Sequence, residues 1–239
     1  MKKILCLSGW AQNHDSLELF LQQSSLIKNN FQIDSFDYLS ENSFAQLNKK
    51  IANYSPLDVI IGWSLGGQLA LRFLASQAIT TKYLILIAPP FQLVKDSRII
   101  SGITPAIKKR VFDLLENNAD QMLKEFITLM ALNDKNAKQL IKTININNHN
   151  IEQLKFWYQQ LASFSCFDLD FSLIPDTLYF HGHGDMVVHI SQKQYFENRI
   201  ANFHQVLFTN CGHAPHLSHT NEMLDSIEKF IGISICNSK

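Results

Sequence analysis

The sequence contains no long hydrophobic run and no excess of charge of either sign. Its 239 residues include 21 Lys and Arg and 21 Asp and Glu, so the formal net charge is +0. A balanced chain has no overall field that would attract nucleic acid or an anionic membrane. No stretch approaches the roughly 20 apolar residues that a membrane-spanning helix needs. We therefore expect neither a nucleic-acid-binding protein nor a membrane protein.

Cysteines are few, and internal repeats and low-complexity segments are absent. No two cysteines form a C-x-x-C pair; the four are Cys6, Cys166, Cys211 and Cys236. Met1–Leu7 faintly resembles the start of a secretory signal, but its apolar run is too short and ends at Ser8. Scattered cysteines in a chain without an export signal are expected to be free thiols. We therefore expect a cytoplasmic protein.

What the sequence does contain is an alternation of strand and helix patterns. Six apolar runs predict strands, at Lys3–Leu7, Gln32–Phe36, Val59–Ile61, Tyr83–Ala88, Thr177–Phe180 and Gln205–Phe208. Helical patterns fill several of the gaps, with a capping box at Ser43–Gln46 and an amphipathic pattern at Met223–Ile231. This alternation predicts an α/β fold with a mostly parallel sheet of about six strands and helices on both faces.

The interval between Ala88 and Thr177 is too long for one crossover connection and shows no convincing strand. Thr104-Pro105 predicts a helix start, with a capping threonine and a proline at the first helical position. Apolar residues then recur at helical spacing through 107–115, 122–130 and 151–161. We expect an inserted lid of about four helices at residues 91–168, with residues 1–90 and 169–239 forming the core.

The most informative motif is Gly62-Trp63-Ser64-Leu65-Gly66, which lies between a predicted strand and a predicted helix. The pattern G-x-S-x-G in this context is typical of the nucleophile elbow of α/β-hydrolases, whose tight turn presents a serine at the carboxyl edge of the sheet. The alternative is an ordinary glycine-rich connection in which the serine caps a helix. The pentapeptide alone does not distinguish the two.

Two further residues lie where a serine nucleophile needs them. Asp185 follows the predicted strand Thr177–Phe180, and His213 follows the last predicted strand. A serine hydroxyl needs a base to take its proton, and the base needs an orienting acid. The order Ser, Asp, His is that of the α/β-hydrolase fold. The three residues together predict a serine hydrolase with Ser64, Asp185 and His213 as its catalytic triad.

An oxyanion hole requires two donors aimed at the developing negative charge. The N–H of Leu65, at the start of the predicted helix, is one candidate. The second should come from the loop after the first strand, Ser8–Ala11, where the N–H of Trp10 is the best candidate. Trp10 is also interpretable as a core side chain that anchors this loop, and one residue can do both.

Other assignments of acid and metal remain open. Asp168 or Asp170 is the acid if Asp185 only caps a turn. The run His181-x-His183-x-Asp185 matches the start of the H-x-H-x-D-H motif that binds zinc in metallo-β-lactamase-like hydrolases, although position 186 is methionine.

Three reactive side chains near the predicted base receive other interpretations. Cys211 precedes His213 by two residues, but nothing resembling a turn or helix start activates its thiol. His216 and His219 follow Pro215, which breaks any common helical face. We expect these two histidines to be packing or surface residues.

The chain resembles the BioH family of α/β-hydrolases, the pimeloyl-[acyl-carrier protein] methyl ester esterases of bacterial biotin synthesis. The resemblance spans nearly the whole chain and is strongest at Leu7–Trp10, Gly62–Gly67, Gly102–Pro105 and Gly212–His219. It implies a carboxylesterase that needs no metal or organic cofactor and acts on the methyl ester of a pimeloyl chain on acyl carrier protein. The alternatives are a general short-chain carboxylesterase, a thioesterase, and a binding protein that has kept the fold without catalysis.

The resemblance also implies a substrate site and a partner surface. The implied substrate-binding residues are Trp10, Ser64, Leu65, Phe126, Ile127, Thr128, Leu129, Met130 and His213. An apolar helix face that packs the lid explains Phe126–Met130 equally well. Basic lid residues would hold the acidic carrier protein, with Lys124, Lys135, Lys138 and Lys142 as counterparts, offset by Glu125 and Asp134. The chain departs from the family at Ser8-Gly9-Trp10, where His-Gly-Trp is usual, and we expect a monomer.

Overall fold

The computed structural model describes residues 1–144 and 150–233. Six strands form one sheet in the order β2-β1-β3-β4-β5-β6, and every neighbouring pair is parallel. The strands are β1 (Lys2–Leu7), β2 (Phe31–Ser35), β3 (Leu57–Trp63), β4 (Thr81–Ile87), β5 (Asp176–Gly182) and β6 (Phe203–Phe208). Each predicted strand is therefore present, and the predicted α/β fold with a parallel sheet is confirmed.

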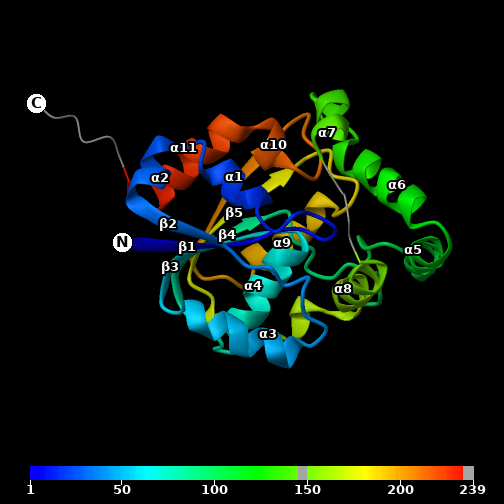
Figure 1. Ribbon diagram of the computed structural model, residues 1–239, viewed down its shortest axis with the longest axis horizontal. Helices are drawn as coiled ribbons and strands as arrows, with labels where there is room; N and C mark the ends of the chain where they lie inside the picture. Colours follow the sequence, from blue (N-terminus) through cyan, green and yellow to red (C-terminus); the bar gives the residue numbers. More distant parts are fainter. Residues whose placement is uncertain (145–149, 234–239) are drawn as a thin grey trace, which may run out of the picture.

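Helices cover both faces of this sheet (Figure 1). One face carries α1 (Ser16–Leu21), α2 (Ser25–Asn30), α10 (Pro215–Ser218) and α11 (Thr220–Phe230), and the other carries α3 (Phe44–Ile51), α4 (Leu65–Ala75) and α9 (Lys193–Glu197). Short 3₁₀ turns lie at Ala52–Tyr54, Cys166–Asp168, Phe171–Leu173 and Ile190–Gln192. Successive strand residues point to opposite faces, so Val59 and Ile60 belong to separate core clusters.

Local capping explains where two of the predicted helices begin. The hydroxyl of Ser43 accepts a hydrogen bond from the N–H of Gln46 at the start of α3. The hydroxyl of Thr104 accepts one from the N–H of Ile107, and Pro105 occupies the first helical position, where its missing N–H costs nothing. Both starts agree with the sequence-based expectation.

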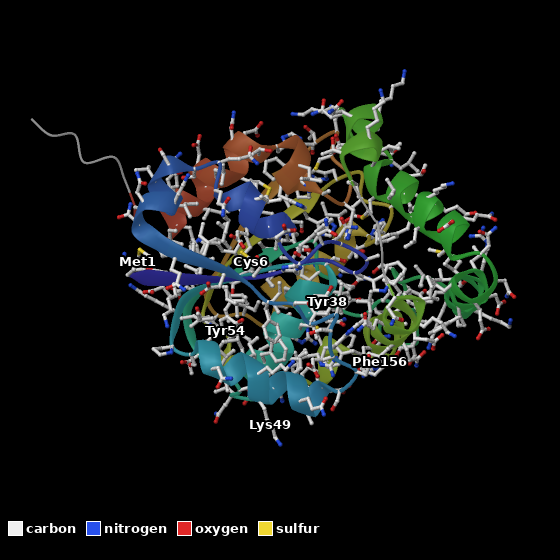
Figure 2. The ribbon with its side chains drawn as sticks, in the orientation of Figure 1. Met1, Cys6, Tyr38, Lys49, Tyr54 and Phe156 are labelled. Carbon is white, nitrogen blue, oxygen red and sulfur yellow. The ribbon has the colours of Figure 1, made fainter. Side chains whose placement is uncertain are left out.

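In the described part of the interval between β4 and β5 lie four helices: α5 (Pro105–Asn117), α6 (Ala119–Ala131), α7 (Ala137–Thr143) and α8 (Ile151–Ser163). We refer to α5–α8 as the helical insertion. In Figure 1 the strands run from the side of the N-terminus toward this insertion, which therefore faces their carboxyl ends. The core and α8 meet at Tyr38, whose ring lies 5.1 Å from that of Trp157, next to Phe156 (Figure 2). Among the described residues, no helix is long and apolar enough to cross a membrane.

Candidate active site

Ser64 occupies a strained turn between β3 and α4. Its backbone has φ 52° and ψ −117°, a region that residues other than glycine rarely adopt. The glycines on either side allow the close approach that this turn needs. A Cβ at Gly62 would lie 2.6 Å from the carbonyl oxygen of Gly66, and one at Gly66 would overlap the backbone of Leu7. The chain thus maintains an unfavourable conformation at one serine, at the carboxyl edge of the sheet.

Asp185 and His213 form a buried pair at the same edge. Asp185 follows β5 and His213 follows β6, and their side chains are fully buried. Nδ1 of His213 lies 2.7 Å from Oδ2 of Asp185. Because an ionised carboxylate can only accept, Nδ1 carries the proton and donates it. In the neutral imidazole, Nε2 therefore keeps its lone pair and is the basic atom.

The surroundings of Asp185 keep its carboxylate ionised. Burial alone would raise its pKa, but the imidazoles of His213 and His181 outweigh burial and hold the pKa of Asp185 below its ordinary value. The alternative acids have other roles. Asp168 forms an exposed ion pair with Arg98, and Asp170 caps a 3₁₀ turn. Of the three candidate acids, the structure brings only Asp185 to His213.

The hydroxyl of Ser64 and Nε2 of His213 are both without a hydrogen-bond partner within residues 1–144 and 150–233. The backbone of His213 is held from both sides, because Nε1 of Trp63 donates to its carbonyl at 2.9 Å and its own N–H donates to the carbonyl of Met130, also at 2.9 Å. Trp63 directly precedes Ser64, so the same tryptophan links the serine turn to the histidine loop. Nε2 is thus a buried, unpaired base on a fixed backbone.

The two backbone N–H groups predicted for the oxyanion hole are both free to donate. Leu65 is the first residue of α4 and Trp10 lies in the loop after β1; neither N–H donates to another described residue. The loop after β1 is fixed by side chains, because Nε1 of Trp10 donates to the carbonyl of Leu154 and the hydroxyl of Tyr38 donates to the carbonyls of Ser8 and Gly9. Trp10 therefore anchors the loop, as one of its two interpretations proposes.

A cavity of about 220 Å³ opens between the core and the helical insertion. Its lining is mainly apolar and includes Trp10, Ser64, Phe126, Leu129 and Val188. An ion pair of Arg110 and Glu125, 2.7 Å apart, also borders it. An apolar cavity that contains one candidate nucleophile has the form of a site for an acyl chain.

The predicted lid segment divides between this cavity and the core. Phe126 and Leu129, three residues apart on α6, line the cavity, whereas Thr128 is exposed and Ile127 packs against the core cluster of α1 and α11. Met130 is buried in that same core cluster and does not line the cavity. Helical geometry gives the reason, since residues three apart share a face and their neighbours point elsewhere. Leu65 and His213 also lie outside the cavity lining.

The end of α6 is attached to the loops that carry the acid and the base. Besides the bond from His213 to Met130, the N–H of Gly212 donates to Oδ2 of Asp134 at 3.2 Å. The N–H of Lys135 donates to the carbonyl of Asn210, and the side-chain amide of Asn133 donates to the carbonyl of Gly184. We call residues 130–135 the anchoring segment. The sequence carries no visible signal for these contacts.

The remaining reactive residues near His213 are buried. Burial raises the pKa of Cys211 to about 12, so its thiol is not a ready nucleophile. The described cysteines Cys6, Cys166 and Cys211 are free, and Cys236 lies outside the described residues. His216 and His219 are both buried, and the ring of His219 stacks on that of Phe208. Within the described ranges, no group of three or more His, Cys, Asp or Glu side chains is arranged to hold a metal ion.

His216 is a buried histidine that should make the protein sensitive to acid. Burial, aided by His213, lowers its pKa from the ordinary 6.5 to about 3, and neither ring nitrogen has a partner among the described residues. At pH values between these two pKa values, His216 therefore binds a proton in the unfolded chain but not in the folded chain. Folding stability falls as the pH drops through this window, by about 1.4 kcal/mol per pH unit.

We therefore expect His216→Phe to remove this acid sensitivity while keeping the ring that packs on Trp63, 4.4 Å away. Between pH 7 and pH 5, the free energy of unfolding should fall by about 2 kcal/mol more in wild type than in His216→Phe. Urea unfolding followed by tryptophan fluorescence at both pH values measures this difference. The exposed His204→Phe is the control. Equal pH slopes in wild type and His216→Phe would contradict the expectation.

Comparisons with known proteins agree with this geometry. The sequence model described as "Alpha/beta hydrolase family" matches residues 33–225. The chain therefore belongs to the alpha/beta hydrolase family. It is 27% identical over 203 residues to the pimeloyl-[acyl-carrier protein] methyl ester esterase of Aliivibrio fischeri (strain MJ11), covering 82% of this chain and 75% of that protein. The protein of the same name from Legionella pneumophila (strain Lens) is 28% identical over 201 residues, covering 82% and 77%.

A solved structure shows the same fold. The esterase EaEST from Exiguobacterium antarcticum matches with a TM-score of 0.84 at 17% identity, covering 97% of this chain and 92% of that one. Together these matches confirm the resemblance to the BioH family and the expected enzyme class, an esterase.

Proposed function

We propose that the chain hydrolyses the methyl ester of a pimeloyl group attached to acyl carrier protein, in biotin synthesis. The observation that carries this proposal is the buried pair of His213 and Asp185, 2.7 Å apart, at the sheet edge that also carries the strained turn of Ser64. The two relatives named above, whose names state this activity, support the choice of substrate. The apolar cavity that Ser64 lines suits an acyl chain.

In the proposed mechanism, the Ser64 hydroxyl turns toward Nε2 of His213, which takes its proton as the oxygen attacks the ester carbonyl. Asp185 keeps the proton of the other nitrogen in place and stabilises the imidazolium. The N–H groups of Leu65 and Trp10 donate to the oxyanion, each worth on the order of 3 kcal/mol of barrier. As the tetrahedral intermediate collapses, the imidazolium of His213 gives its proton to the departing methoxide, which leaves as methanol. Water, activated by His213, hydrolyses the acyl-enzyme and restores the free serine.

The substrate is tested by comparing three compounds with one preparation of enzyme: a carrier-linked pimeloyl methyl ester, a short-chain p-nitrophenyl ester and an acyl-carrier thioester. We expect kcat/KM to be highest for the carrier-linked methyl ester. If the short ester is hydrolysed well and the carrier-linked one is not, the enzyme is a general esterase. Preferred cleavage of the thioester bond would make it a thioesterase. Rescue of a biotin auxotroph that lacks its own esterase gives an independent result.

We also propose that the exposed lysines of α6 and α7 bind the acidic carrier protein. Lys124 and Lys138 lie on these helices and form no ion pair with another described residue. The double variant Lys124→Glu, Lys138→Glu should raise KM for the carrier-linked substrate by about fivefold or more at low salt and leave small esters unaffected. Steady-state kinetics at two salt concentrations measures both effects.

The matched control carries the same charge change away from the helical insertion. Lys28 lies on α2 and Lys49 on α3, and Figure 2 shows Lys49 on the far side of the core. Lys28→Glu, Lys49→Glu should leave both KM values unchanged. If small esters suffer as much as the carrier-linked substrate from the α6 and α7 changes, the docking surface lies elsewhere.

A further inference from the structure

A second histidine lies behind the acid of the candidate triad. His181 is fully buried in β5, four residues before Asp185. Its Nε2 lies 2.9 Å from the carbonyl oxygen of Val188 and 3.0 Å from Oδ2 of Asp185. Its Nδ1 lies 2.5 Å from the hydroxyl of Tyr179, which is also fully buried. Tyr179, His181 and Asp185 thus form a hydrogen-bonded series. It ends at Oδ2 of Asp185, the atom that also accepts from Nδ1 of His213.

The partners of His181 determine its tautomer. Nε2 faces a carbonyl and a carboxylate, and both can only accept, so Nε2 carries a proton. Burial, with Asp185 adding to it, raises the pKa of Tyr179 well above its ordinary value, so the phenol keeps its proton and donates it to Nδ1. Tyr179 therefore selects the tautomer of His181 whose proton lies on Nε2 and points to the acid turn.

His181 also holds the turn that carries Asp185. Oδ1 of Asp185 accepts from the N–H groups of Val187 and Val188, at 2.8 and 2.9 Å. Both backbone groups of Val188 are therefore hydrogen-bonded: its N–H donates to Asp185, and its carbonyl accepts from Nε2 of His181. Val187 and Val188 line the cavity that contains Ser64. The histidine therefore joins the acid, its turn and one wall of the cavity.

We propose that His181, oriented by Tyr179, is a positioning residue that aims the carboxylate of Asp185 at His213. The inference rests on the proposed function, because it assigns His181 a task in that reaction. It involves no proton transfer to substrate and no contact with it. Its effect is to keep Oδ2 within reach of His213 Nδ1 and to share the negative charge of the carboxylate, which tunes the basicity of His213.

The first test compares two substitutions of His181. His181→Phe keeps the ring volume and removes both polar atoms, whereas His181→Gln keeps an N–H donor in the place of Nε2. We expect kcat for a small ester to fall about tenfold or more in His181→Phe, with KM within about twofold, because a small displacement of a catalytic group costs that much. His181→Gln should recover most of the loss. The exposed His183→Gln is the matched control and should behave as wild type.

Two readouts separate positioning from folding. Without the donor from His181, the carboxylate holds the His213 imidazolium more strongly, so the acidic limb of the kcat/KM profile, where protonation of His213 stops catalysis, should move to higher pH in His181→Phe. The low-field proton resonance of His213 Nδ1–H should also shift. A variant that is only less stable to heat, with unchanged kcat, pH profile and resonance, would overturn the proposal. So would an equal loss in His181→Gln and His181→Phe.

Tyr179→Phe provides a second variant if His181→Phe does not fold. It removes only the hydroxyl that selects the tautomer, so kcat should fall about threefold to fivefold and the His213 proton resonance should shift. An unchanged resonance in Tyr179→Phe contradicts the inference. Failure of the proposed function is recognised separately on wild-type protein: low activity on the carrier-linked methyl ester rejects the substrate, and a fluorophosphonate probe that leaves Ser64 unlabelled rejects the serine mechanism, whatever the resonance does in the variants.

Discussion

Ser64→Ala should abolish ester hydrolysis while the protein stays folded. The hydroxyl lines the apolar cavity on the strained turn, and it makes no hydrogen bond within the described residues that folding would lose. Loss of the serine from a working triad lowers kcat on the order of 10⁵–10⁶-fold. The residual rate should reflect only binding and the two backbone donors, Leu65 and Trp10.

Three measurements test this result together: kcat on a small methyl ester, labelling by a fluorophosphonate probe, and the midpoint of thermal unfolding. Ser76→Ala, at the other end of α4, is the matched control and should keep full activity. A Ser64→Ala protein that still turns over its ester above about 1% of the wild-type rate would show that another residue attacks. If Ser64→Ala loses activity and also unfolds at a much lower temperature, the variant does not test the hydroxyl. Labelling of Ser64 by the probe in wild-type protein then decides its role.

Asp185→Asn should lower kcat by about 10⁴-fold. The amide oxygen can replace Oδ1 and still accept from Val187 and Val188, which puts the amide nitrogen against His213. An N–H group facing Nδ1 reverses the tautomer of His213, so the proton moves to Nε2 and the base is lost. The effect is on kcat, because the cavity lining is unchanged.

The control for this variant is Asp168→Asn, since Asp168 was an alternative acid and is exposed in an ion pair with Arg98. It should keep wild-type activity. The stability profile adds a second readout with a defined sign. The pKa of Asp185 is lowered by folding, so its contribution to stability is present above the unfolded value, about 3.9, and is lost as the pH falls further. That acid-dependent contribution should be missing in Asp185→Asn. A larger loss of activity in Asp168→Asn than in Asp185→Asn would reassign the acid.

The strands and the order of the candidate triad were predictable because they depend on local patterns. The run Val59–Ile61 is apolar and β-branched, and the glycines after it allow a tight turn, so β3 and the position of Ser64 follow from neighbouring residues. Asp185 and His213 each follow a strand, and parallel strands end at one edge. The observed strands begin one or two residues before their predicted starts, β3 and β5 end two residues later, and β2 and β4 end one residue earlier, which periodicity does not reveal.

Contacts between distant segments were not predictable in the same way. Helical spacing indicated that Phe126–Met130 has an apolar face, but it could not show that Phe126 and Leu129 meet the cavity while Met130 packs into the core. The run His181-x-His183-x-Asp185 suggested a metal, whereas the structure joins His181 to Tyr179 and Asp185 and leaves His183 exposed. A motif names residue types, and only the fold decides which of them face each other.

The anchoring segment divides the helical insertion into two parts of different kinds. Residues 130–135 are joined to the loop of His213 by backbone and side-chain hydrogen bonds, and to the loop of Asp185 by the side chain of Asn133, so they belong structurally with these loops although they lie within the insertion. Evolution or engineering can therefore exchange α5 and most of α6 to reshape substrate preference, while a graft that crosses residue 130 disturbs the base itself. A chimera junction belongs before Met130.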